Sequence, residues 1–493
     1  MKKLINITLL SAILIFAVGC NEDFLEKEPS AILTTAQLQD AASRNPDIVK
    51  GTVTGIYGTM VETGTGGTTG HDDFGHKAYD VFSDMLSSDM ALSVSTYGWY
   101  RASITEMKCT QDFTYTDNYQ VWRHYYRIVR SANSVIAQLG GNDFTPELDE
   151  NKYLMGQAKA MRAHSYFYLA QYFQKSYNPS EEILPMYDDL EDLNGPKVTA
   201  GEVYTLVEND LMDAISLLDG YSRPAKNEVN QDIAKAILAY VYGAMGRDSE
   251  AKTLAADVIN TGAYTLMNSD EVLGGFNNLA TSGWMWGVDL NADTDLDLVS
   301  WWGQIDYFSY SYAGYGDAKA IDQGLFDAIP ANDVRKGQFS SSGGYTYLMP
   351  LNKFYDENRV VRGNSTTVYA DYVFMRIAEM YLLHAETSAR SGDDGSARTS
   401  LKALLSQRVD DVSYVDGLSG QALLDEIYLQ TRIELWGEGK SYLAMKRNKA
   451  TIVRGSNHLS FVGEPISYDD ERLTFEIPES EIQNNPFVSD QNL

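Results

Sequence analysis

The chain has 493 residues, and its 68 Asp and Glu residues outnumber its 39 Lys and Arg residues, giving a formal net charge of −29. This charge argues against nucleic-acid partners, because phosphate contacts require cationic side chains that displace condensed counterions, and it argues equally against anionic lipid surfaces. The 44% hydrophobic and 22% charged fractions are typical of a globular chain with a sizeable core.

Residues 1–19 have the proportions of a secretory signal peptide that is removed from the mature protein. Lys2 and Lys3 give a positive start, and the apolar stretch that follows is shorter than the roughly 20 residues that a membrane-spanning helix needs. The segment ends in Ala-Val-Gly before Cys20, which resembles the lipobox of bacterial lipoproteins, where this cysteine is lipidated. Several acyl chains would anchor the protein durably. Cys109 would then be the one remaining thiol, so no intramolecular disulfide is expected.

Helical periodicity dominates the mature chain. Apolar residues recur every three or four positions over 157–173 and again over about 201–218, which predicts two helices. A long loop between them contains Pro179, Pro185 and Gly195-Pro196. Short strand ribbons are expected at 343–351 and 473–477.

Two later segments share one spacing of small residues. The intervals are the same in both: Ala239, Gly246 and Ala251, then Ala385, Gly392 and Ala397. Small residues at these places let paired helices approach closely, the glycines allow the turn, and the intervals equal those of the tetratricopeptide repeat. We therefore predict a mostly α fold, a tetratricopeptide-like helical repeat body with long loop-rich insertions and few short strands.

Two stretches, 62–101 and 268–370, lack helical periodicity and are predicted to be insertions packed on this body. Long ordered loops commonly carry function. Aromatic residues gather in both: Tyr97, Trp99 and Tyr100 in the first, and Trp284, Trp286, Trp301, Trp302, Tyr307, Tyr310, Tyr312 and Tyr315 in the second.

Flat rings on loops suit the apolar faces of sugar rings, while tyrosine hydroxyls and nearby carboxylates bond the sugar hydroxyls. Large aromatics also tend to bury themselves, as Trp122 and Trp436 on helical stretches are expected to do. We expect the 284–315 group to divide between ligand binding and core. The candidate ligand-binding residues are Tyr97, Trp99, Trp284, Trp286, Trp301, Trp302, Tyr307 and Tyr310.

Oxygen-bearing side chains alternate between positions 289 and 297, at a spacing that resembles a calcium loop: Asp289, Asn291, Asp293, Asp295 and Asp297. However, Thr294 stands where an EF-hand needs glycine, and Ser300 where it needs its bidentate glutamate. A solvated acidic loop is therefore favoured, calcium is the minority alternative, and no other cofactor is expected. No pair of carboxylates stands out as a glycosidase pair, although so acidic a chain does not exclude one.

Ordered motifs along nearly the whole chain resemble the SusD/RagB family of nutrient-binding outer-membrane lipoproteins. The matching segments are Cys20 to Pro29, 122–136, Met161 to Phe173, Met375 to Glu386, Glu434 to Gly439, and Ile477 to Pro486. Met375 to Glu386 is the most specific of them. One departure is Gln430-Thr431, where the family has an acid–Arg pair, and we expect this change to affect local ion pairing.

The resemblance implies a binding protein and not an enzyme. Such a protein sits on the cell surface, anchored by lipid to the outer membrane, captures an oligo- or polysaccharide, and closes over a SusC-like TonB-dependent transporter. The expected parts are an N-terminal helical region at 20–230 and a C-terminal region at 231–493, with a ligand-binding insertion at about 268–370. A peptide-binding, RagB-like uptake protein is the first alternative, and a surface glycosidase is the second.

Overall fold

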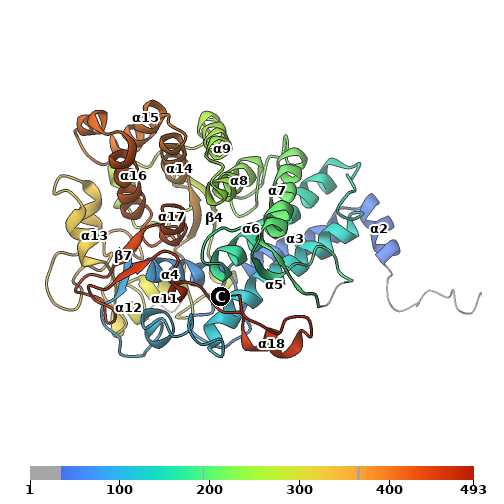
Figure 1. The fold of residues 1–493 in the computed structure, drawn as a ribbon, viewed down its shortest axis with the longest axis horizontal. Helices are drawn as coiled ribbons and strands as arrows, with labels where there is room; N and C mark the ends of the chain where they lie inside the picture. Colours follow the sequence, from blue (N-terminus) through green and yellow to red (C-terminus); the bar gives the residue numbers. More distant parts are fainter. Residues whose placement is uncertain (1–34, 192–193, 364–366, 493) are drawn as a thin grey trace, which may run out of the picture.

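Helices joined by long irregular segments make up most of the protein in a computed structural model that describes residues 35–191, 194–363 and 367–492 (Figure 1). The predicted signal peptide and Cys20 lie outside these residues. Within the described residues, no helix combines the length and apolarity that crossing a membrane would require.

The N-terminal helices pack side by side and include both helices predicted from apolar periodicity. They are α2 (Thr35–Arg44), α3 (Asp47–Thr59), α5 (Thr116–Gln138), α6 (Asp149–Phe173) and α7 (Ala200–Leu217). The start of α7 is fixed by a capping box, in which the Thr199 hydroxyl accepts from the Glu202 amide and the Glu202 carboxylate accepts from the Thr199 amide. The predictions for 157–173 and 201–218 are confirmed.

The repeat predicted from small residues is a pair of helix-turn-helix units. The first is α8 (Gln231–Met245) with α9 (Asp248–Asn260), and the second is α14 (Ile377–Arg390) with α15 (Asp394–Leu405). Gly246 and Gly392 follow α8 and α14 with φ of 74° and 82°, a left-handed conformation that favours glycine. The predicted alanines are fully buried. Helix α9 packs on α14, so units far apart in sequence form one stack, extended by α16 (Gly420–Glu434) and α17 (Ser441–Arg447).

The strands are short and form antiparallel two-stranded ribbons. The pairs are β1 (Met90–Leu92) with β5 (Lys319–Ile321), β2 (Glu182–Pro185) with β3 (Lys197–Thr199), β4 (Trp284–Val288) with β6 (Tyr372–Arg376), and β7 (Thr451–Val453) with β8 (Pro465–Ser467). The ribbon β1–β5 ties the two predicted insertions together, and β4–β6 ties the second insertion to the segment that leads into α14.

The prediction of short strands at 343–351 and 473–477 is wrong. In the first segment, positive φ at Gly344 and Leu348 breaks the extended alternation. In the second, the Phe475 amide donates to the carbonyl of Tyr172 at the end of α6, and the Ile477 amide donates to the Gln491 side chain. These amides therefore do not pair with a neighbouring strand.

Short helices interrupt the remaining segments. They are α4 (His76–Leu86), α10 (Ser269–Val272), α11 (Trp301–Ile305), α12 (Tyr312–Tyr315), α13 (Gln323–Ala328) and α18 (Glu479–Asn484). In Figure 1, α11, α12 and α13 lie on the side of the molecule opposite α2, below the stacked helices α14 to α16. This position places the insertion beside the helical repeat.

A buried charge network fastens the insertion to the repeat helices. It consists of Asp333, Arg335, Lys353, Arg376, Arg408, Glu434 and Glu438, all buried. Glu434, the last residue of α16, accepts from the guanidinium groups of Arg335, Arg376 and Arg408. These arginines hold the pKa of Glu434 well below its usual value although burial opposes them. Gln430 accepts from Arg335, so the residue that departs from the family pattern joins this network as a neutral acceptor.

Candidate ligand-binding site

The four tryptophans of the 284–302 window lie in the core. Their exposed fractions are 0% for Trp284 and 2% for each of Trp286, Trp301 and Trp302. The Trp286 indole N–H donates to the carbonyl of Asn227 at 2.8 Å, and its ring packs edge-on against His164. The prediction that these four rings face a ligand is wrong, because β4 and α11 turn them towards the helical body, where large rings bury most apolar area.

The other aromatic residues of the two windows reach the surface. Tyr97 is 57% exposed and Tyr310 is 43% exposed, while Trp99 and Tyr307 are half-buried. Trp122 on α5 and Trp436 are buried as expected, although Trp436 lies in the turn after α16 and not in a helix. The candidate site therefore moves from the tryptophan window to the loop at 95–99 and the region around α12.

Six rings from three segments form what we call the aromatic platform: His71, Tyr97, Trp99, Tyr310, Tyr312 and Tyr315. The His71 and Trp99 rings are stacked, with centroids 5.2 Å apart and planes 4° from parallel. Tyr312 lies at the centre, with its ring edge-on to His71, Tyr97 and Trp99 at centroid distances of 5.8, 5.3 and 5.9 Å. Tyr310 and Tyr315 form a second pair at 5.7 Å.

Asp317 holds the loop that carries Tyr97 and Trp99. Its carboxylate is buried and accepts from the backbone amides of Thr96, Tyr97 and Trp99 at 2.7, 2.9 and 3.3 Å. Three donors on one carboxylate fix the backbone of an otherwise irregular segment. The rings of this loop are therefore ordered before any ligand arrives, which lowers the entropic cost of binding.

Polar contacts support the platform from behind. The Tyr312 hydroxyl hydrogen bonds with His71 Nδ1 at 2.6 Å, and Gln304 donates to the carbonyl of His71 at 2.8 Å. Lys319 donates to the Gln304 side chain at 2.7 Å. Burial lowers the pKa of Lys319 to about 7, with Asp317 and Asp72 opposing the change. These contacts fix the position of His71 under the Trp99 ring.

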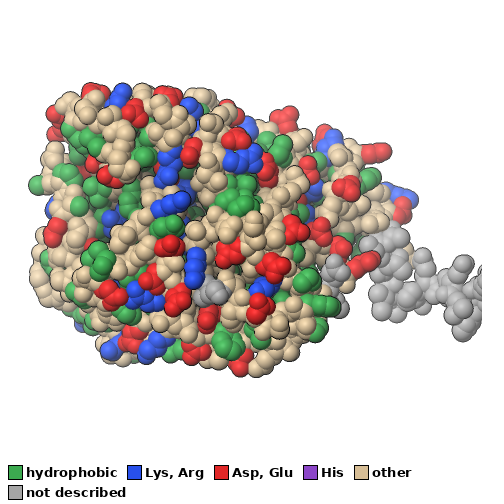
Figure 2. Space-filling model, viewed as in Figure 1, with side chains coloured by type: hydrophobic (Ala, Val, Ile, Leu, Met, Phe, Trp, Pro, Cys, Tyr) green, Lys and Arg blue, Asp and Glu red, His purple; other side chains and the backbone are tan. Residues whose placement is uncertain are grey.

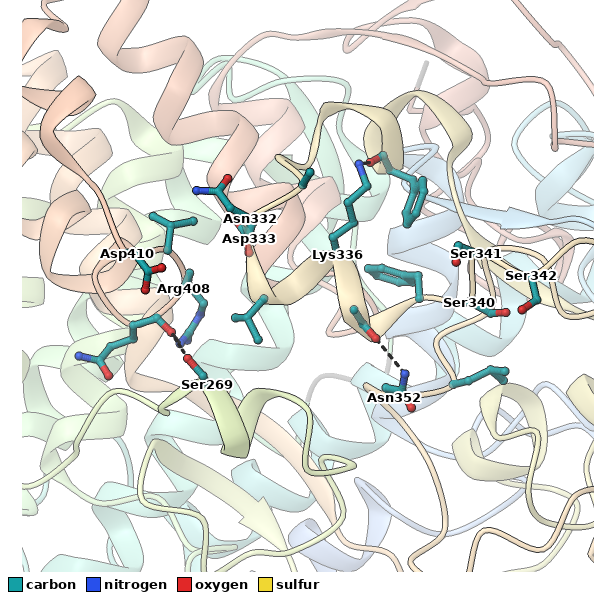
Figure 3. A pocket seen from close by; sticks show the side chains of 18 of the residues that line it. Ser269, Asn332, Asp333, Lys336, Ser340, Ser341, Ser342, Asn352, Arg408 and Asp410 are labelled. Carbon is teal, nitrogen blue, oxygen red and sulfur yellow. Dashed lines mark hydrogen bonds between the residues drawn. The ribbon is translucent and has the colours of Figure 1, made fainter.

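A polar groove of about 870 Å³ lies between the insertion and the end of α15 (Figure 3). Figure 3 shows Ser340, Ser341 and Ser342 near Asn352 at one end, and Arg408 and Asp410 at the other. Arg359 and Leu351 line the groove, and Leu351 also packs on the apolar cluster that includes Tyr307 and Tyr345. The groove thus meets a cluster that includes Ala313 of α12, although no residue of the platform lines the groove itself. Its volume falls within the range of roughly 300–1,000 Å³ typical of ligand pockets.

A smaller cavity of about 240 Å³ is surrounded by positive charge. Lys and Arg side chains gather over α14 and α17 on the face shown in Figure 2. Here the C-terminal ends of α6, α8, α14 and α17 meet, Lys446 donates to carbonyls at the end of α6, and Arg390 donates to the carbonyl of Arg447 at 2.9 Å. Because helix C-termini carry partial negative charge, these cations are stabilised there and donate hydrogen bonds to the free carbonyls of the helix ends.

The acidic run at 289–297 lies in an exposed segment. Asn291 caps a short 3-10 turn by accepting from the Asp293 amide at 2.9 Å, and Asp289, Asp293 and Asp295 are exposed. Among the residues described here, no group of three or more His, Cys, Asp or Glu side chains is arranged to hold a metal ion. The geometry is that of a solvated turn.

Comparison with known proteins matches this architecture to one family. A sequence model described as "Starch-binding associating with outer membrane" matches residues 61–242, and a second, described as "SusD family", matches residues 307–493. The two matches together include the platform segments, most of α8 and the second helix pair of the repeat, α14 and α15, while α9 lies between them. The chain belongs to the SusD family.

Individual SusD-like relatives are distant in sequence but similar in fold. A SusD-like carbohydrate-binding protein of Bacteroides vulgatus has a TM-score of 0.75 at 23% identity, over 90% of this chain and 96% of that one. A SusD superfamily protein of Bacteroides thetaiotaomicron has a TM-score of 0.72 at 21% identity, over 91% and 99%. SusD-like protein P25 of Formosa agariphila is 20% identical over 281 residues, 57% of this chain and 51% of that relative, so the match spans about half of the relative.

Membership of the SusD family implies a role in carbohydrate binding and nutrient uptake at the outer membrane. Sequence reasoning missed several residues of the candidate site, above all His71 and Asp317. Their partners are distant in the chain: Asp317 bonds amides more than 200 positions away. The nearest sequence signal was the pair of aperiodic stretches, 62–101 and 268–370, which the platform brings together.

Proposed function

We propose that this SusD-family protein is a cell-surface lipoprotein, anchored through Cys20, that binds an oligo- or polysaccharide on the aromatic platform. It then delivers the glycan to a SusC-like TonB-dependent transporter in the outer membrane. The family match, the lipobox-like segment before Cys20 and the ordered surface rings support this proposal. Its role is capture, without chemical change of the ligand.

The observation that carries the proposal is the exposed and pre-ordered aromatic platform. Trp99 and Tyr97 present ring surface to solvent from a loop fixed by Asp317, while Tyr310 and Tyr315 add hydroxyl groups. Sugar rings have apolar faces and polar edges, so a ligand that stacks on these rings can also hydrogen bond at their margins. The polar groove, connected to α12 through Leu351 and the cluster around Ala313, offers polar side chains to further sugar units.

Titration calorimetry of the purified protein against a glycan panel tests this function. We expect Trp99→Ala to weaken binding of the preferred glycan by roughly 10- to 100-fold, because stacked aromatic rings act as binding hot spots. Phe487→Ala is the matched control, since Phe487 is an exposed aromatic residue outside the platform. Equal affinities in the wild type and Trp99→Ala would refute the platform as the binding site.

Two further measurements separate the proposal from its alternatives. Binding of peptides but of no glycan would favour a peptide-uptake protein, and release of reducing sugar from a bound glycan would identify a glycosidase.

Cys20→Ala is expected to release the protein from the membrane, and co-purification of a TonB-dependent barrel with the lipidated protein would test the partner. Failure to recover any such barrel under conditions that preserve the membrane complex would contradict the delivery step.

A further inference from the structure

Residues 355–363, which we call the arginine loop, run along the edge of the platform. Arg359 and Arg362 have φ of 49° and 51°, a left-handed conformation that is uncommon for residues other than glycine. The loop is held in place because the Arg362 amide donates to the carbonyl of Tyr307 at 3.1 Å and the Gly363 amide to that of Phe308 at 3.2 Å. Backbone conformations of this kind concentrate at binding sites, where surrounding contacts stabilise them.

The arginine loop is joined to the platform through α12. The Tyr315 hydroxyl donates to the carbonyl of Arg362 at 3.3 Å. A side chain at Gly314 would meet the Arg362 side chain at 3.5 Å, so the two segments are in contact. The Arg362 guanidinium lies 5.7 Å from the Tyr315 ring centroid and 5.6 Å from that of Tyr345. Arg362 is therefore packed against a ring of the platform itself.

Both guanidinium groups keep hydrogen-bonding capacity. Arg362 and Arg359 are exposed, and in the described part of the chain neither has a carboxylate partner. Arg359 donates to the Leu351 carbonyl and to Asn352, whereas the Arg362 guanidinium makes no hydrogen bond to any described residue. An arginine stacked on aromatic rings has its flat face covered while its N–H edge remains available. In a chain with 68 acidic residues, other exposed arginines such as Arg101 do pair with carboxylates.

Three of the carboxylates around the arginine loop are occupied by other donors, whereas Glu357, within the loop, is exposed and accepts no hydrogen bond from a described residue. Asp306 accepts from the amides of Phe308 and Asp356 at 2.9 and 3.2 Å, and Asp356 accepts from the Asn358 amide at 3.1 Å. Asp317 accepts the three amides of the Tyr97 loop. Asp306, Asp356 and Asp317 are thus engaged with the backbone, and Glu357 makes no ion pair with Arg359 or Arg362 among the described residues, so both guanidinium groups stay available at the platform edge.

We propose that the platform selects glycans that carry an anionic group, a carboxylate or a sulfate ester, and that Arg362 binds this group. The proposal rests on the function proposed above and names its ligand class. The N–H edge of Arg362 can form two parallel hydrogen bonds to the anion while the adjacent sugar ring stacks on Tyr315 or Tyr310. Arg359, on the rim of the groove, binds a second anionic unit further along the chain.

Calorimetry with three probes tests this selectivity: a short oligogalacturonate, a sulfated carrageenan oligosaccharide of similar length, and neutral maltohexaose. We expect at least one anionic probe to bind roughly tenfold or more tightly than the neutral one, with an affinity that falls as salt is added. Arg362→Gln should weaken the anionic probe by roughly 10- to 100-fold and leave maltohexaose unchanged. Arg362→Lys should restore only part of the loss, because an ammonium group lacks the planar two-donor edge.

Arg130→Gln is the matched control, since Arg130 is exposed on α5 and has no carboxylate partner among the described residues. Whether the wild type binds oligogalacturonate or carrageenan more tightly shows whether the site prefers a carboxylate or a sulfate ester. Neutral glycans that bind in a Trp99-dependent manner, with no preference for either anionic probe, would overturn the anion selectivity alone. Absence of binding of the wild type to every glycan tested would overturn the proposed function as well.

Discussion

Replacing Glu434 by glutamine tests whether the buried charge network fastens the insertion to the repeat helices. Glu434 accepts two bonds from Arg408, at 2.9 and 2.8 Å, one from Arg376 at 3.0 Å and one from Arg335 at 3.2 Å. All four residues are buried. The substitution keeps the shape of the side chain, removes its charge, and turns one acceptor into an N–H group that faces other donors.

The expected cost follows from these contacts. A hydrogen bond to a charged group contributes about 1.5–3 kcal/mol, so four of them set an upper limit of roughly 6–12 kcal/mol. Glutamine keeps one acceptor oxygen, and removing one partner of a buried ion pair costs about 3–5 kcal/mol. We therefore expect Glu434→Gln to lower the free energy of unfolding by about 3–5 kcal/mol, a large part of the 5–15 kcal/mol typical of folded proteins.

Urea unfolding followed by circular dichroism at pH 7 measures this loss. Glu62→Gln is the control, because Glu62 is exposed and the same chemical change there should alter stability by less than about 0.5 kcal/mol. Gln430→Ala, which removes one neutral acceptor from Arg335, should fall between the two at about 1–2 kcal/mol. A loss below about 1 kcal/mol for Glu434→Gln would refute the reasoning that the three arginines depend on this carboxylate.

Three other substitutions test the core, the platform and the pH response. Trp301→Ala should cost about 3–5 kcal/mol in urea unfolding, because the ring is buried against Phe354, and a loss near zero would mean that the ring faces solvent. Asp317→Asn should cost about 1–3 kcal/mol and weaken glycan binding in calorimetry, because its three amide donors lose a carboxylate; unchanged affinity would contradict the ordering of the Tyr97 loop. Burial lowers the pKa of His164 to about 3. Between pH 6.5 and 3 this histidine is therefore protonated only in the unfolded chain, so the free energy of unfolding falls by about 1.4 kcal/mol for each pH unit as the pH is lowered. The His164→Gln variant has no such titrating group, so the difference in free energy of unfolding between wild type and variant should shrink by about 1.4 kcal/mol for each unit by which the pH is lowered. Urea unfolding at a series of pH values measures this difference, and a difference that does not change with pH would contradict the buried neutral His164.

Local patterns in the sequence were sufficient for the helical parts of the fold. Apolar periodicity identified the helices at 157–173 and 201–218, and the shared spacing of Ala239, Gly246 and Ala251 with the second set identified the repeat. These features depend on contacts between residues three to twelve positions apart, so the sequence alone carries them. The ordered family motifs likewise led to the SusD family.

The exposure of the aromatic rings was decided by tertiary structure. Trp284 and Tyr97 lie in stretches of similar composition, yet one is buried and the other is 57% exposed. What distinguishes them is the partner: β4 pairs with β6 against the helices, whereas the Tyr97 loop is held by Asp317 from a segment more than 200 residues away. Burial depends on which distant segment covers a side chain, and a single sequence contains no local signal of that choice.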